Sequence, residues 1–197
     1  PNLLTDEIIK FCFSSKKFTP HFHIPLQSGS NRILKKMRRR YFVETYSERI
    51  NFIKSLDSMA CIGVDVIVGF PGEKEEDFLK TYDFLNNLDI SYLHVFSYSE
   101  RTNTDALKIK KTIPNNVRAN RSKMLRILSE KKKRLFYERS LKTKKLVLFE
   151  SHRNEKLIGH TENYIKVLVP GPKDFINSIK KVEIYHNAGT HVEGFVL

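Results

Sequence analysis

One short segment constrains the fold of this chain more than any other: residues 61–68, which lead directly into Gly69-Phe70-Pro71-Gly72. Most of this run is β-branched and apolar, which is typical of a strand buried on both faces of a parallel sheet. Four carboxylates follow within residues 73–77, where negative charge favours the start of a helix. The segment therefore predicts a strand, a tight glycine turn and a helix in direct succession.

The same alternation continues on both sides of this unit. We expect helices over residues 3–12, from about residue 31, over 43–56 and after residue 73, and strands over residues 22–26, 61–68 and 92–98. Alternating helices and strands predict an α/β fold built on a parallel sheet. Three parallel strands cannot close a barrel, so we expect sequence outside this chain to continue the sheet.

The second half of the chain has a different pattern of expected helices and strands. A long helix is expected after Pro114, with Val117, Met124, Leu128 and Leu135 on one face and Ile127 beside it. Short strands are then expected at residues 146–149, 157–158, 164–169, 182–185 and 194–197. Closely spaced short strands predict a small antiparallel β-barrel. We place the domain boundary near Leu141, which gives domains 1–140 and 141–197.

The positive charge is concentrated in one segment. The net charge is +13, and residues 106–156 hold 17 Lys or Arg against 4 Glu, so the rest of the chain is balanced. A dense basic segment attracts nucleic acid through its phosphates. A solvated helix face without a partner, or an acidic membrane surface, would carry the same composition.

The cysteine content excludes several arrangements. The two cysteines, Cys12 and Cys61, form no CxxC or CxxxCxxC motif. The sequence has no run of about 18 apolar residues and no signal-peptide pattern. We therefore expect reduced thiols in a cytoplasmic protein without a membrane partner.

Three loops are candidate binding sites. His21 and His23 lie on one strand face, but no third ligand is evident near them, so we predict no metal site. The loop at residues 27–30 follows that strand and suits a ribose or a carboxylate. Gly69 either allows close approach of a ligand to the backbone or serves only to form a tight turn. Arg101 suits the binding of an anion, or an ion pair with a nearby acidic side chain. Asp65 and Glu73 have no spacing specific to acid–base chemistry.

Residues 20–30, 65–73 and 96–101 strongly resemble, in order, signatures of the methylthiotransferase family of radical S-adenosylmethionine enzymes. Residues 92–101 look most like the subgroup that acts on threonylcarbamoyladenosine in tRNA. The tail from Leu141, including residues 159–164, is similar to a TRAM domain, a small OB-like RNA-binding barrel.

The resemblance implies the C-terminal part of a partial TIM-type (β/α) radical barrel followed by that small barrel. Family members bind S-adenosylmethionine and two 4Fe–4S clusters, whose cysteine sets this chain lacks, so we expect it to be inactive alone. The residues expected to border S-adenosylmethionine are Gln27, Ser28, Ile67, Gly69 and Phe70. Arg101 is expected to contact substrate or cofactor. The residues expected to meet tRNA phosphates are Lys131, Lys132, Lys133, Arg134, Lys144 and Lys145.

The predicted activity is methylthiolation at C2 of N6-threonylcarbamoyladenosine near the tRNA anticodon. One alternative is a role in tRNA binding alone. Others are methylthiolation of isopentenyladenosine or of a ribosomal protein aspartate. A TIM-barrel lyase or aldolase without an RNA partner would need a catalytic lysine or paired carboxylates at strand ends, and no convincing set is present.

Overall fold

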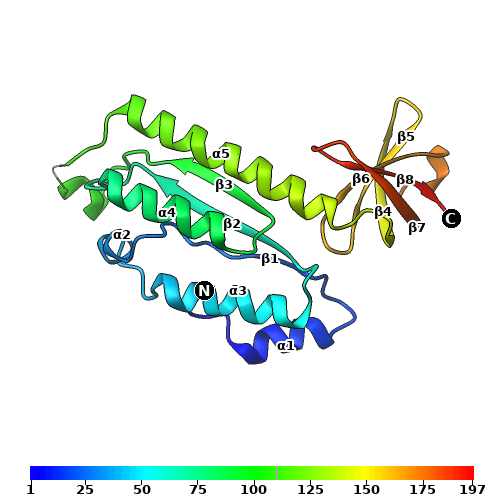
Figure 1. Cartoon of the computed structure of the whole chain (residues 1–197), viewed down its shortest axis with the longest axis horizontal. Helices are drawn as coiled ribbons and strands as arrows, with labels where there is room; N and C mark the ends of the chain where they lie inside the picture. Colours follow the sequence, from blue (N-terminus) through cyan, green and yellow to red (C-terminus); the bar gives the residue numbers. More distant parts are fainter. Residues whose placement is uncertain (110) are drawn as a thin grey trace.

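A computed structural model describes residues 1–109 and 111–197. The first part of the chain alternates helix and strand as predicted (Figure 1). Its elements are α1 (Asp6–Ser14), β1 (His21–His23), α2 (Asn31–Lys36), α3 (Val43–Leu56), β2 (Cys61–Val68), α4 (Glu75–Asn87), β3 (Tyr92–Ser97), the 3-10 helix η1 (Asp105–Lys108) and α5 (Asn115–Glu138). The three strands form a parallel sheet in the order β1-β2-β3.

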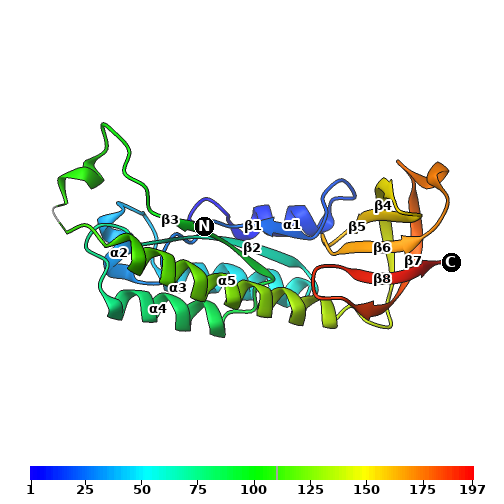
Figure 2. The ribbon, with the colours of Figure 1, turned by 90° about the horizontal axis from the view of Figure 1, so that it is seen from above.

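The sheet has one apolar and one polar face. Ile62, Val64 and Val66 of β2 are fully buried in a core shared with the helices. Figure 2 shows α3, α4 and α5 gathered on this one side of the sheet. Because strand side chains alternate in direction, residues 63, 65 and 67 point to the opposite face. That face carries Asp65 and Ile67.

β1 is shorter than predicted. Only residues 21–23 form regular strand, although Ile24 and Leu26 still donate backbone hydrogen bonds to β2 at 2.9 and 3.1 Å. Pro25 lies between them and has no N–H to donate, which limits the regular ladder to its first residues.

The C-terminal strands form a closed barrel of mixed direction. They are β4 (Lys144–Arg153), β5 (Lys156–Thr161), β6 (Lys166–Pro170), β7 (Ile179–Asn187) and β8 (Val192–Val196), with the 3-10 helix η2 (Lys173–Phe175) between β6 and β7. Their order is β4-β5-β6-β8-β7. The prediction of a purely antiparallel barrel was wrong, because β6 and β8 pair in parallel to close it. Gly159 permits a tight crossing here, since a Cβ would lie 2.1 Å from the Leu148 carbonyl oxygen.

The small barrel adjoins the amino ends of the parallel strands. The β2 and β3 arrows point away from it in Figure 1. Its core continues onto the end of α5 through Phe136 and Tyr137, and onto Cys61 at the start of β2. Asn163 donates a hydrogen bond of 2.9 Å to the Met59 carbonyl, across the junction. The carboxyl ends of the strands therefore lie at the opposite end of the sheet from the small barrel.

Among the described residues, no helix is both long and apolar enough to cross a membrane.

Candidate functional site

The carboxyl edge of the sheet begins where Gln27 meets β2. Gln27 has a φ of 71°, in the left-handed region that non-glycine residues rarely occupy. Its N–H donates to the Asp65 carbonyl at 2.9 Å, and its carbonyl accepts from the Ile67 N–H at 2.9 Å. These two bonds hold Gln27 beside Ile67. Strained backbone of this kind is concentrated at functional sites.

The glycine turn after β2 is fixed by a buried glutamate. Gly69, with a φ of +77°, donates its N–H to Glu73 at 2.7 Å. Arg121 of α5 pairs with the same carboxylate at 2.7 Å, and both side chains are at most 5% exposed. Burial raises the pKa of Glu73, although the Gly69 N–H and Arg121 act in the opposite direction. The turn is thus locked to α5 through one ion pair.

A second arginine of α5 supports the segment after β3. Arg118 donates to the Tyr98 carbonyl at 2.8 Å and pairs with Glu100 at 2.6 Å. Its side chain also packs on Gly69, where an added Cβ would lie 2.4 Å from Arg118 Cγ. One buried guanidinium therefore joins the turn after β2 to the loop after β3.

Two adjoining cavities open at this edge. One, of about 390 Å³, is lined by Arg101 and Phe96, and the other, of about 370 Å³, by Phe70 and Arg39; both contain Ile67. Tyr98 borders both cavities and packs edge-to-face on Phe70, with ring centroids 5.4 Å apart. The second cavity also carries basic side chains from the end of α2, namely Lys36 and Arg38. The edge combines aromatic surface with positive charge.

The structure brings together most of the predicted cofactor-edge residues. Ile67, Phe70 and Arg101 line the cavities, and Gln27 is bonded to Ile67. Ser28 differs: it is fully buried, with its Oγ 3.3 Å from Thr81 Oγ1. Its hydroxyl is directed to α4, so it supports the loop from within.

Sequence reasoning missed Arg118, Arg121 and Tyr98. The two arginines are three residues apart and share a face of α5. That spacing was visible in the sequence, but their carboxylate partners are 18 to 48 residues away and could not be assigned. Asp65 and Glu73, for which the spacing gave no specific acid–base role, have separate partners: Asp65 pairs with His23 and Glu73 with Arg121.

The predicted phosphate-binding residues fall into two groups. Lys131 and Arg134 are exposed on α5. Lys132 instead donates to the carbonyls of Asn86 and Leu88 at 2.7 and 2.6 Å, and burial lowers its pKa. The remaining members have nearby partners: Lys133 lies over the Tyr137 ring, Lys144 is 3.8 Å from Glu183 and Lys145 is 3.4 Å from Glu162.

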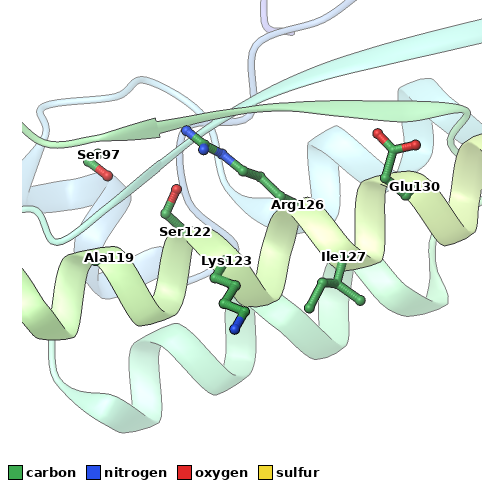
Figure 3. A pocket seen from close by; sticks show the side chains of 7 residues that line it. All are labelled: Ser97, Ala119, Ser122, Lys123, Arg126, Ile127 and Glu130. Carbon is green, nitrogen blue, oxygen red and sulfur yellow. The ribbon is translucent and has the colours of Figure 1, made fainter.

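A groove of about 540 Å³ runs between α5 and the outer edge of β3 (Figure 3). Arg126 reaches toward the strand, whereas Lys123 and Ile127 point away from it. Ser122 Oγ in this groove is buried and has no hydrogen-bond partner among residues 1–109 and 111–197. The groove adds a basic side chain and a free hydroxyl along α5.

The two cysteines do not fit a cluster site. Cys12 is on α1, and Cys61 is buried at the amino end of β2. Burial raises the pKa of Cys61 to about 11 and disfavours the thiolate that binds metal.

Residues 1–85, which include β1, β2 and the glycine turn, match the family model described as Radical SAM superfamily. The chain is 46% identical over 168 residues to threonylcarbamoyladenosine tRNA methylthiotransferase MtaB of Aquifex aeolicus, covering 85% of this chain and 40% of that protein. It is 38% identical over 196 residues to the protein of the same name from Bacillus subtilis, covering 97% and 44%.

A further relative is the tRNA-2-methylthio-N(6)-dimethylallyladenosine synthase of Clostridium tetani, 36% identical over 199 residues, covering 98% of this chain and 44% of that protein. The chain spans less than half the length of these relatives. The predicted resemblance to radical S-adenosylmethionine tRNA methylthiotransferases, and to the threonylcarbamoyladenosine subgroup among them, is confirmed.

Proposed function

We propose that this chain is part of an enzyme that methylthiolates C2 of N6-threonylcarbamoyladenosine near the tRNA anticodon. In this proposal residues 1–140 form the C-terminal part of a TIM-type radical barrel, and residues 141–197 form a TRAM-like RNA-binding barrel. The enzyme acts in the cytoplasm. The similarity to two MtaB proteins over 85% and 97% of the chain carries the assignment.

The carboxyl edge has the groups that S-adenosylmethionine needs. The bound cofactor would supply the radical chemistry. Ile67, which is bonded to Gln27, offers apolar surface at the strand end, and Phe70 offers an aromatic ring. Arg39 and Arg101 are exposed cations suited to the cofactor carboxylate or to a substrate anion. Arg121 and Arg118 position the edge from α5.

The iron–sulfur clusters do not fit this chain. Cys12 and Cys61 lie on separate elements, and burial of Cys61 raises its pKa and disfavours the thiolate. The ligands of both clusters would therefore belong to sequence outside the 197 residues, and we derive no step through them.

The geometry supports a substrate that contacts both ends of the molecule. Arg118 lies at the cofactor edge and Tyr137 at the small barrel, 19 residues apart on α5. At about 1.5 Å per residue, this separation is about 28 Å. A tRNA anticodon arm along α5 would place a base at the strand ends while its backbone meets Lys131, Arg134 and the small barrel.

The substrate assignment is tested by complementation. The full reading frame that contains this sequence is expressed in a bacterium lacking its own MtaB, and tRNA nucleosides are quantified by mass spectrometry. We expect 2-methylthio-N6-threonylcarbamoyladenosine to reappear. Restoration of 2-methylthio-isopentenyladenosine alone, in a strain lacking the enzyme that makes this nucleoside, would favour methylthiolation of isopentenyladenosine. Modification of a ribosomal protein aspartate would favour the alternative in which that aspartate is the substrate.

The chain alone is also a candidate tRNA-binding module. The small barrel exposes Tyr185 and Phe195 as a stacked pair, with centroids 6.2 Å apart. Base–aromatic stacking on such barrels is a common mode of RNA binding. We expect the purified chain to bind tRNA with affinity that falls steeply between about 50 and 200 mM salt. No binding at about 50 mM salt would contradict both RNA-binding proposals.

A further inference from the structure

The polar face of the parallel sheet brings three metal-ligating side chains together. His23 of β1, Asp65 of β2 and His94 of β3 each offer one ligand atom, and these atoms lie within 4.8 Å of one another. The His23 Nε2–Asp65 Oδ1 distance is 2.7 Å, and the His94 Nδ1–Asp65 Oδ1 distance is 3.6 Å. Within residues 1–109 and 111–197 this is the one such group of three.

Strand register produces the cluster. Asp65 is paired with His94, and His23 is paired with Gly63, two residues before Asp65 on the same face. Gly63 leaves space for the Tyr92 ring, because an added Cβ would lie 2.4 Å from that ring. The ring lies beside both histidines, with centroids 6.4 Å from His23 and 5.2 Å from His94. The Tyr92 ring therefore packs beside both histidines of the ligand set.

A hydrogen bond accounts for only part of this arrangement. It joins His23 to Asp65, while His94 lies beyond hydrogen-bond distance of the same carboxylate oxygen. Two atoms bound to one tetrahedral zinc ion at about 2.0–2.2 Å lie about 3.3–3.6 Å apart. All three ligand atoms lie within 4.8 Å of one another, so the longest separation needs to close by at most about 1.5 Å, while the 2.7 Å contact between His23 and Asp65 opens; side-chain rotation can supply both shifts.

We propose that His23, Asp65 and His94 form a binding site for a divalent transition-metal ion, separate from any iron–sulfur cluster. Two imidazoles and one carboxylate suit zinc or iron(II), and three protein ligands leave positions open for water or an exogenous ligand. His21 is not a member, since its Nε2 is 2.8 Å from the Tyr92 hydroxyl and its ring stacks on Tyr164. This proposal differs from the sequence-based expectation that no metal binds, and it does not depend on the proposed function.

The test uses Zn²⁺ and the purified 197-residue chain. Zinc affinity and stoichiometry are measured by competition with a chromophoric chelator. We expect one ion per chain, with affinity falling at least about 100-fold in Asp65→Asn and in His94→Ala, since loss of an outer-shell partner alone costs about 10–100-fold. His94 is half exposed, so its removal should leave the thermal unfolding midpoint of the metal-free chain unchanged.

The matched control is His186→Ala, which removes another exposed histidine 3.1 Å from a carboxylate, Glu193, on the small barrel. This variant should bind zinc as the parent does. Equal zinc binding by the parent, Asp65→Asn and His94→Ala chains would overturn the proposal, as would failure of the folded parent to bind one equivalent at micromolar Zn²⁺. Folding of each chain is checked by circular dichroism. Binding of tRNA is measured separately and bears only on the proposed function.

Discussion

Tyr164 of the small barrel stacks on His21 of β1, with ring centroids 4.2 Å apart and planes 10° apart. The Tyr164 ring is also stacked on His160, with centroids 4.9 Å apart. Tyr164 has a φ of 63°, an uncommon conformation for an aromatic residue. Together with the Asn163–Met59 hydrogen bond, this stack holds the small barrel at the amino ends of the parallel strands.

Tyr164→Ala should weaken the junction between the two parts. Loss of aromatic stacking costs about 0.5–1.5 kcal/mol, so we expect the free energy of unfolding to fall by about 1 kcal/mol. We also expect the urea unfolding transitions of the parallel sheet and the small barrel to move apart. Tyr185→Ala is the control, because its ring stacks on Phe195 within the barrel. Similar separation of the two transitions in both variants would argue against the junction role.

Arg121→Leu should be the most damaging change at the carboxyl edge of the parallel sheet. It leaves the buried Glu73 carboxylate without its cation, and breaking a buried pair costs about 3–5 kcal/mol. Glu73 already has a raised pKa, which would rise further, so the variant should lose stability as pH rises through that folded-state pKa. Urea unfolding at several pH values measures this.

The control for that variant is Arg139→Leu. Arg139 pairs with Asp89 at 2.9 Å, and both side chains are nearly half exposed. Exposed pairs contribute about 0–1 kcal/mol, so this change should have a small and nearly pH-independent effect. Equal losses in the two variants would show that burial of Glu73 is not the cause.

Acid should destabilise the protein through Asp77. Burial raises the pKa of this carboxyl, but hydrogen bonds from Arg32, Ser30 and the Lys74 N–H outweigh burial and bring the pKa to about 2. Because the pKa of Asp77 is depressed, its ionised carboxylate stabilises the fold at pH values above the unfolded-state pKa. This stabilisation is lost as pH falls from about 5 to about 2. Allowing for the partly exposed Arg32, we expect a loss of about 1–2 kcal/mol.

The Asp77 contribution is measured by urea unfolding between pH 7 and pH 2. Asp77→Asn should remove this part of the acid sensitivity and lower stability at pH 7. An unchanged pH dependence in the variant would assign the acid sensitivity to other carboxyl groups.

Basic residues of α5 should separate into RNA contacts and structural contacts. Replacing Lys131 and Arg134 together by alanine should weaken tRNA binding and reduce the slope of log affinity against log salt by about 2, with little change in stability. Lys132→Ala should instead lower the unfolding midpoint, because its ammonium holds two carbonyls at the end of α4. The reverse pattern would place the RNA contact at Lys132.

Most elements could be predicted because their signals are local. β2 spans the predicted residues Cys61–Val68, and α3 spans Val43–Leu56. The face of α5 was less predictable: Ile127 and Leu135 are 61% and 52% exposed, whereas Phe136 and Tyr137 are buried. A helix contacting a sheet at one end and a small barrel at the other buries different faces along its length.

Pairing between distant residues required the tertiary structure. The basic segment stands out in composition, but Arg118, Arg121 and Arg139 form ion pairs with carboxylates elsewhere in the chain. Strand register determines which side chains face one another, and no local pattern encodes it. Motif order and apolar periodicity were therefore enough to locate most of the strands, though not all of their bounds, together with the glycine turn and the resemblance. Only folding placed His94 beside Asp65 and directed Ser28 into the core, because both depend on contacts between elements far apart in sequence.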